Sequence, residues 1–180
     1  MRSTPEPQSG EPEIGVRVAA PGDRDAIIEV VRDAFSRDGR SGQEEVDIVV
    51  RTWTLEAALQ GLELVAVAED SVVGYVLGAR GDLGGREVVA VAPLAVSTSY
   101  QRRGAGSALM TELVARADAA RYPLIVLLGN PAYYRRFGFE PSGPLGISYP
   151  QVGDGDPHFQ VRRLTGYDSS YRGKVTYCWE

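Results

Sequence analysis

The start of one helix in this chain has the residue types that bind phosphate. The apolar segment Ala92–Val96 leads through a short polar loop to Gln101–Gly106, and apolar residues with helical spacing follow directly. Gly104 and Gly106 have no Cβ and Ala105 has the smallest one, so a ligand can approach the backbone closely. The first amides of a helix lack partners within it, and the helix dipole favours an anion there. The pattern therefore predicts a phosphate or pyrophosphate cradle.

Two common nucleotide-binding motifs do not account for this loop. A P-loop requires a Lys-Ser or Lys-Thr pair after its glycines, and the only lysine of the chain is the distant Lys174. A dinucleotide-binding loop requires a third glycine where Leu109 stands. It also requires an acidic residue after the next strand, which here ends in Gly129-Asn130. A tight strand-to-helix connection that binds nothing is the remaining alternative.

A second set of residues with chemical potential follows the helix. The continuous apolar run Pro123–Leu128 is typical of a strand buried on both faces of a parallel sheet. Strand, helix and strand then form one right-handed crossover unit. Tyr133 and Tyr134 come directly afterwards, ahead of Gly138-Phe139. Each tyrosine could serve chemistry or could simply pack its ring on a short helix.

Together the two motifs resemble those of the GCN5-related N-acetyltransferases (GNAT). Gln101–Gly106 matches the family's Gln/Arg-x-x-Gly-x-Gly/Ala loop, and Tyr134 with Gly138-Phe139 matches its Tyr-x-x-x-Gly-Phe signature. The resemblance implies that acetyl-CoA is the co-substrate, that its pyrophosphate lies on the loop, and that a primary amine receives the acetyl group. It also implies that Tyr134 is the general acid at the coenzyme sulfur. The combined motifs are most similar to a bacterial branch of uncharacterised small acetyltransferases, which implies no particular acceptor.

The resemblance implies a fold as well. This is an α/β fold whose mixed, mostly antiparallel sheet of about seven strands is splayed between its fourth and fifth strands, with helices on both faces. The residue patterns predict one helix that begins after Asp23, its N-cap, and a second helix across Val46–Trp53. They also predict a long irregular loop over 141–157, which would pass over the acceptor side of the cleft. Alternation and apolar runs predict strands at 14–18, 62–68, 72–79, 87–96, 123–128, 159–164 and 174–179.

Pro93 is unusual in a predicted central strand, because proline cannot donate to a sheet ladder. In the resembling family the fourth and fifth strands separate and the pantetheine arm of the coenzyme lies between them, so Pro93 would mark where the ladder opens. Arg102 and Arg103 could steer the polyanionic coenzyme, and Arg135 or Arg136 could reach its adenosine phosphate, although all four could simply be solvated. The coenzyme-binding residues that the resemblance implies are Leu94, Ala95, Val96, Gln101, Arg102, Arg103, Gly104, Ala105, Gly106, Ser107, Asn130 and Tyr134.

The proton acceptor is where the sequence departs from the family pattern. Many members carry a glutamate on the fourth strand near the sulfur, whereas here that place is taken by Val91-Ala92-Pro93. Glu87 comes too early on the strand. The alternatives that stay open are Glu29, Glu44 or Glu45, His158, and a path through water. The only histidine, His158, could also be a residue in solvent or at the rim of the core without a catalytic role.

Composition limits the partners that the protein can have. The chain has 180 residues, which suits a single domain over 13–180 after a disordered leader over 1–12. A net charge of −5 gives no case for binding nucleic acid or an anionic membrane. The single cysteine, Cys178, fits a buried apolar position, and the sequence predicts no metal site. Without an apolar run long enough to span a membrane, or a signal peptide, a cytoplasmic location is expected.

Three functions fit these observations. The first is an N-acetyltransferase that acts on a small-molecule amine. The second is a protein or peptide N-acetyltransferase, although 141–157 suggests a covered site where a peptide would need an open groove. The third is a non-catalytic acyl-CoA-binding module, which the missing strand-four carboxylate favours. A homodimer is left open.

Overall fold

The structure is a computed structural model that describes residues 12–37, 39–153 and 155–180. The predicted leader over 1–12 lies outside the described residues except for Pro12. The helices are α1 Arg24–Phe35, α2 Gln43–Thr54, α3 Ala105–Ala119 and the short α4 Pro131–Tyr134. The strands are β1 Gly15–Val18, β2 Ala58–Ala68, β3 Ser71–Leu83, β4 Arg86–Val96, β5 Leu124–Leu128, β6 Glu140–Pro141, β7 Ile147–Ser148, β8 Phe159–Arg163 and β9 Gly173–Tyr177.

The strands form one mixed sheet in the order β1-β2-β3-β4-β5-β8-β6, and β9 joins it by pairing with β3. Within that order β4 and β5 are parallel and the other neighbours are antiparallel. The two-residue strand β7 pairs with β9 in parallel. Among the described residues, seven strands have four or more residues, and they correspond to the seven that the sequence predicts. The predicted α/β class and the mixed, mostly antiparallel sheet are confirmed.

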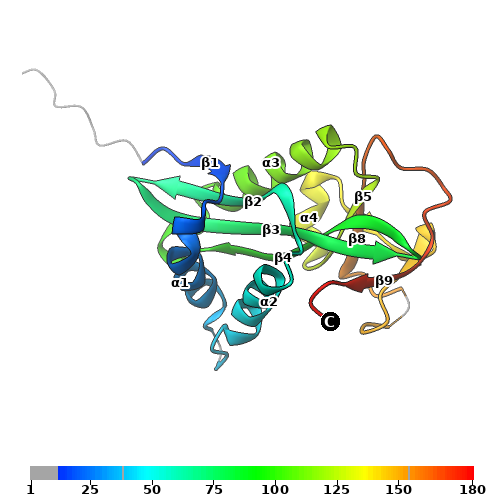
Figure 1. Cartoon of the computed structure of the whole chain (residues 1–180), viewed down its shortest axis with the longest axis horizontal. Helices are drawn as coiled ribbons and strands as arrows, with labels where there is room; N and C mark the ends of the chain where they lie inside the picture. The colour runs from blue at the N-terminus through cyan, green and yellow to red at the C-terminus, as the bar shows by residue number, and fades with distance from the viewer. Residues whose placement is uncertain (1–11, 38, 154) are drawn as a thin grey trace, which may run out of the picture.

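Helices cover both faces of the sheet, as predicted (Figure 1). On one face α1 and α2 pack Ile27, Val31 and Val49 against the sheet, and on the other face α3 packs Leu109 and Leu113 against it. Each buried side chain of this size contributes about 1.5–3 kcal/mol, so packing rather than intrinsic propensity accounts for most of the stability of these helices.

Two predicted strands are longer than expected. The strand predicted over 62–68 begins at Ala58, and the strand predicted over 72–79 continues through Leu83, so that only Gly84 and Gly85 lie in the turn that follows. The added residues Gly81–Leu83 pair with β4 on one side and with β9 on the other. Because β9 lies about ninety residues further along the chain, this stabilising partner is invisible to a local pattern.

Asp23 occupies the predicted N-cap position of α1, but its side chain does not cap that helix. Pro21–Asp23 forms a short 3-10 turn ahead of α1, and the carboxylate of Asp23 makes no capping bond to that helix. It accepts a hydrogen bond from the backbone N–H of Ala20 at 2.7 Å and binds the guanidinium of Arg17. The hydrogen bond from Arg17 lowers the pKa of Asp23 to about 2. The side chain of this N-cap residue therefore joins β1 to the turn that precedes the helix.

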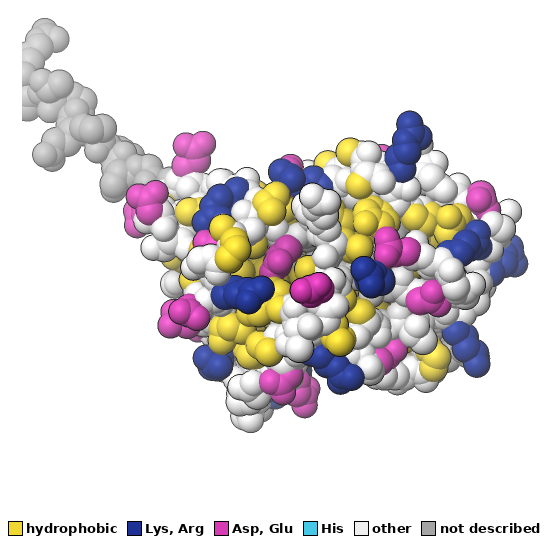
Figure 2. Space-filling view, viewed as in Figure 1, with side chains coloured by type: hydrophobic (Ala, Val, Ile, Leu, Met, Phe, Trp, Pro, Cys, Tyr) yellow, Lys and Arg dark blue, Asp and Glu magenta, His cyan; other side chains and the backbone are white. Residues whose placement is uncertain are grey.

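Lysine and arginine side chains are interspersed with aspartate and glutamate on the face in Figure 2, with no block of one sign. None of the helices in the described part of the chain is long and apolar enough to cross a bilayer. The same residues contain no group of three or more His, Cys, Asp or Glu side chains that could hold a metal ion.

Candidate active site

The sheet opens between β4 and β5. Their parallel pairing covers Val89–Val91 of β4 and Ile125–Leu127 of β5, and it ends there. The ladder between β3 and β4 is interrupted just beyond Val91, where Ala92 and Pro93 lie. From Leu94 to Val96 the strand β4 pairs with β3 alone. Its other edge therefore has no partner among the residues that the structure describes, and the predicted splay at Pro93 is confirmed.

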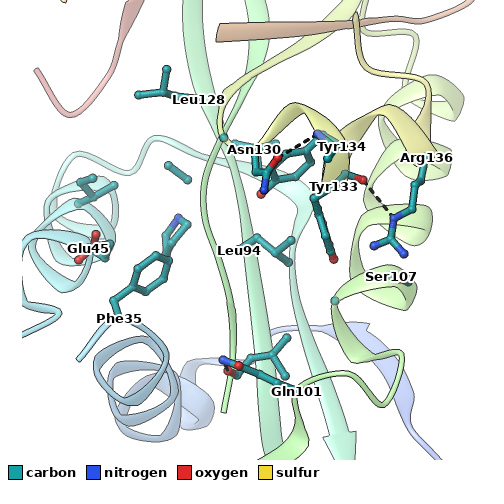
Figure 3. Close-up of a pocket in the computed structure, with 18 of the residues that line it drawn as sticks. Phe35, Glu45, Leu94, Gln101, Ser107, Leu128, Asn130, Tyr133, Tyr134 and Arg136 are labelled. Carbon is teal, nitrogen blue, oxygen red and sulfur yellow. Dashed lines mark hydrogen bonds between the residues drawn. The ribbon is translucent and has the colours of Figure 1, made fainter. Parts of the chain in front are cut away.

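A cavity of about 1460 Å³ follows this opening and includes most of the predicted coenzyme-binding residues (Figure 3). The residues from that set that line it are Leu94, Val96, Gln101, Arg102, Gly104, Gly106, Ser107, Asn130 and Tyr134. Three others do not. Ala95 and Ala105 are each 1% exposed in the core, and Arg103 is turned toward the ring of Tyr100. Alternation along a strand explains Ala95, because its neighbours Leu94 and Val96 face the cavity and it must face the other way.

The predicted anion cradle is the N-terminus of α3. Gly104 precedes the helix with a φ of 90°, a left-handed conformation that favours glycine. Gln101 holds the preceding loop against β4, since its Nε2 donates to the carbonyl oxygen of Val96 at 3.0 Å. Gly106 and Ser107, in the first turn, line the cavity. The backbone here can therefore accept an anion such as a diphosphate, which the helix dipole also favours.

The two tyrosines of α4 occupy different places. Asn130 begins this short helix, because its Oδ1 accepts a hydrogen bond from the N–H of Ala132 at 2.9 Å. The hydroxyl of Tyr133 reaches the first turn of α3, and the guanidinium carbon of Arg136 lies 4.4 Å from its ring centre. The ring of Tyr134 instead packs in the core beside β5.

Tyr134 is held in an apolar setting that still borders the cavity. Its ring lies so close to Gly129 that a Cβ there would come within 2.3 Å of the ring carbon Cε2. The ring also meets the rings of Phe139 and Tyr133 at centroid distances of 5.7 and 4.9 Å. Burial raises the pKa of the Tyr134 phenol well above its ordinary value. The phenol is therefore a group that keeps its proton.

The cavity is also lined by residues from segments distant in sequence, which together we call the acceptor chamber. Figure 3 shows Glu45 and Phe35 on one side of Leu94, opposite Tyr133 and Ser107. The residues of the acceptor chamber are Phe35, Glu45, Ile48, Leu128, Tyr149, Tyr177 and Trp179. Of these residues the sequence analysis selected only Glu45 as a functional candidate.

The C-terminal residues are brought to α2 by tertiary contacts. The guanidinium of Arg51 in α2 donates to the backbone carbonyl of Glu180 at 2.9 Å, and Trp179 packs against the core cluster that contains Val46 and Val49. The predicted long loop at 141–157 contributes only Tyr149 to the walls among its described residues. That loop is also less irregular than predicted, because Ile147-Ser148 pairs with β9.

Known proteins with a similar sequence identify the family. A family model described as an acetyltransferase (GNAT) domain matches residues 61–141. The uncharacterised N-acetyltransferase YhbS of Escherichia coli K12 is 32% identical over 152 residues, which cover 83% of this chain and 86% of that protein. The chain belongs to the GNAT acetyltransferases. A second E. coli K12 relative, the uncharacterised N-acetyltransferase YjhQ, is 32% identical over 139 residues, 73% of this chain and 77% of that protein.

Solved GNAT structures have the same fold. The crystal structure of E. coli YhbS in complex with CoA superposes with a TM-score of 0.83 at 28% identity, covering 96% of this chain and 93% of that one. A GNAT acetyltransferase of Brucella melitensis in complex with acetyl-CoA gives a TM-score of 0.76 at 26% identity, with 94% and 100% covered. The family, the fold and the acyltransferase class predicted from the sequence are confirmed.

The candidate proton acceptors of this GNAT site differ in whether they line the cavity. Glu29 and Glu44 are exposed and do not line the cavity. Glu87 forms a surface ion pair with Arg80, and exposed His158 binds the carboxylate of Asp156 through Nδ1 at 3.0 Å. Neither of them lines the cavity. Of these candidates only Glu45 does.

The arginines that the sequence analysis selected also differ in whether they line the cavity. Arg102 and Arg136 line the cavity, whereas Arg103 and Arg135 do not. Arg37, which the sequence analysis did not select, lines it as well and donates to the side-chain oxygen of Gln101. Three guanidinium groups of the described residues thus border the cavity of this GNAT protein, whereas Glu45 brings a carboxylate to the acceptor chamber.

Proposed function

We propose that the protein transfers the acetyl group of acetyl-CoA to the primary amine of a small molecule. The observation that carries this proposal is one continuous cavity. It joins the anion cradle at the N-terminus of α3, the unpaired edge of β4 and an acceptor chamber that contains a carboxylate.

The backbone of the cradle is the proposed site for the coenzyme pyrophosphate. Amides near Gly106 and Ser107 would bind it, while Arg102 and Arg136 would add exposed ionic contacts of about 1 kcal/mol or less each. Leu94 to Val96 would bind the pantetheine arm through the free edge of β4. From the opposite wall, the side-chain nitrogen Nδ2 of Asn130 would donate a hydrogen bond to the same arm. Complexes of YhbS with CoA and of the Brucella protein with acetyl-CoA support this assignment.

The proposed reaction is direct attack by the amine on the thioester. A base first removes one proton from the ammonium group, so that the neutral nitrogen can attack. The new C–N bond forms and the C–S bond breaks, while a backbone N–H near Leu94 to Val96 stabilises the oxyanion. Tyr134 gives its proton to the departing sulfur, and the proton shed by the new amide nitrogen restores the phenol. The raised pKa of Tyr134 supports this role, because the phenol is protonated at physiological pH.

A small acceptor is favoured over a peptide by the aromatic residues that border the acceptor chamber. Tyr149, Tyr177 and Trp179 form a continuous set, with ring centroids 4.6 and 4.7 Å apart. A chain passing through in extended form would need an open groove at this place. A non-catalytic acyl-CoA-binding role makes no use of the Glu45 carboxylate that lines the cavity. The predicted cytoplasmic location and a homodimer stay predictions.

Two measurements test the proposal. Isothermal calorimetry with acetyl-CoA should give saturable one-to-one binding, and release of free thiol should then accelerate with at least one class of primary amine. Binding without thiol release across small amines would support the acyl-CoA-binding alternative. Thiol release with peptides alone would support the peptide acetyltransferase. Absence of acetyl-CoA binding would contradict all three.

A further inference from the structure

Unpaired polar atoms mark the acceptor chamber. In the part of the chain that the structure describes, three buried side-chain nitrogen or oxygen atoms lack a hydrogen-bond partner, namely Oε2 of Glu45, Nε of Arg162 and the hydroxyl of Tyr177. Glu45 and Tyr177 both line the cavity. A buried polar group without a partner costs about 1–3 kcal/mol, and more when it is charged. Such an atom beside a cavity is a candidate position for a group of the ligand that supplies the missing partner.

The carboxylate of Glu45 is oriented as well as unpaired. Its Oε1 accepts a hydrogen bond from Nη2 of Arg40 at 2.8 Å, which fixes the side chain at one oxygen only. The side chain is 15% exposed, whereas that of its neighbour Glu44, bound to the same guanidinium at 3.3 Å, is 86% exposed. One arginine thus holds two glutamates, Glu44, which is exposed to solvent, and Glu45, which lines the cavity and is labelled in Figure 3.

The remainder of the acceptor chamber is apolar or aromatic. Phe35, Ile48 and Leu128 contribute apolar side chains. The hydroxyl of Tyr149 is already used, because it donates to Oε1 of Glu180 at 2.7 Å. A ligand that fits this chamber must donate hydrogen bonds at Glu45, can also meet the unpaired hydroxyl of Tyr177, and presents apolar surface to the other side chains.

We infer that Glu45 binds the ammonium group of the acceptor and removes its proton, and that the acceptor is a primary amine on an aromatic or other apolar body without an anionic group. This inference rests on the proposed function and names the base and the substrate class within it. The proton moves from the nitrogen to Oε2 of Glu45 before the C–N bond forms. Tyr134 separately protonates the sulfur when the C–S bond breaks.

The same chamber selects against other amines. The carboxylate of an amino acid would be repelled by Glu45, and the guanidinium beside it, that of Arg40, is already bound to Glu44 and Glu45. The further ammonium groups of a polyamine would have to leave water for apolar walls without a second carboxylate, which is costly. Specificity would thus come from unfavourable contacts with the wrong amine as much as from favourable contacts with the right one.

The test compares Glu45→Gln with the matched control Glu44→Gln and uses two amines of nearly the same shape. Phenethylamine is a cation at neutral pH, whereas β,β-difluorophenethylamine is a much weaker base and is largely neutral in mildly alkaline buffer. We expect Glu45→Gln to lower kcat/KM for phenethylamine on the order of 100-fold, with a much smaller loss for the fluorinated amine. Glu44→Gln should change neither. Both variants should bind acetyl-CoA as the unsubstituted protein does and should melt at a similar temperature.

The outcomes separate this inference from the function on which it rests. Failure of the unsubstituted protein to bind acetyl-CoA would overturn the proposed function itself. Normal binding with equal turnover in Glu45→Gln would overturn only the role of Glu45, and equal losses for the two amines would overturn its role as base. A preference for phenylalanine or spermidine over phenethylamine, or acetyl-CoA binding without turnover of either phenethylamine, would overturn the acceptor class.

Discussion

The hydroxyl of Tyr133 lies against Gly106, so closely that a Cβ on Gly106 would stand 2.7 Å from the hydroxyl oxygen. A side chain that projects from Gly106 must therefore enter the space between α3 and α4. That space is part of the cavity, at the end where the helix dipole favours an anion.

We expect Gly106→Asp to abolish binding of acetyl-CoA, because it adds bulk and a negative charge where the pyrophosphate is proposed to lie. Calorimetry measures this directly. The matched control is Gly106→Ala. The loop motif accepts alanine at this position and the flexible end of Tyr133 can move, so affinity should fall only slightly. Normal binding by the aspartate variant would remove the cradle from the proposed site.

Gly129→Ala should disturb Tyr134 without touching the ligand. The new Cβ would overlap the tyrosine ring at 2.3 Å, and a ring packed against Phe139 has little room to move. We expect a loss of about 1–3 kcal/mol in the free energy of unfolding, measured by urea denaturation, together with reduced turnover. Gly15→Ala is the control, because nothing lies within 4 Å of the place where its Cβ would stand, and it should leave both quantities nearly unchanged.

Tyr134→Phe should lower turnover at least about tenfold, since proton transfer by a positioned acid contributes about that much or more. Affinity for acetyl-CoA should change little, because the ring and its contacts stay in place. Steady-state thiol release and calorimetry give the two numbers. A variant as fast as the parent protein would show that the sulfur leaves without this phenol.

The pH dependence of turnover follows from the burial of Tyr134. An acid works in its protonated form, and desolvation raises the pKa of this phenol above the ordinary tyrosine value of about 10. As the pH rises from about 7 to about 10 the phenol should therefore keep its proton, and kcat should not decline over that interval. Stability must be followed in parallel by circular dichroism. A decline near pH 9 that disappears in Tyr134→Phe would contradict this assignment.

Tyr177→Phe should leave the free protein as stable as before or more stable by about 1 kcal/mol, because it removes a buried hydroxyl for which the described residues provide no partner. Tyr149→Phe makes the contrast. It removes a hydroxyl that donates to Glu180 at 2.7 Å and should cost about 1 kcal/mol. Thermal denaturation of the two variants side by side decides the matter, and a clear loss of stability in Tyr177→Phe would indicate a partner for its hydroxyl.

The sequence predicts what is local in the chain. The cradle at Gln101–Gly106 and the tyrosines of α4 are contiguous motifs, and Pro93 carries its own constraint on the ladder, so the coenzyme side of the site could be predicted. Even there, counting alternate residues along β4 would have separated Ala95 from Leu94.

The acceptor chamber depends on contacts between distant segments. Trp179 reaches it because β9 pairs with β3 and the C-terminus is held by Arg51, and neither contact leaves a local pattern. Glu44 and Glu45 are adjacent, so the choice between them depends on the rotation of α2 about its axis. Packing of that helix on the sheet sets the rotation, and the sequence alone left both residues open.

The three-residue ladder between β4 and β5 has a consequence for handling the protein. Beyond Val91 the separated strand presents bare main-chain donors and acceptors, and such an edge is a template on which another extended chain can add. An occupant of the cleft would shield that edge. Samples kept with the coenzyme should therefore resist self-association during storage better than ligand-free samples. The edge that we propose to bind the coenzyme would otherwise be free to pair with a second protein molecule.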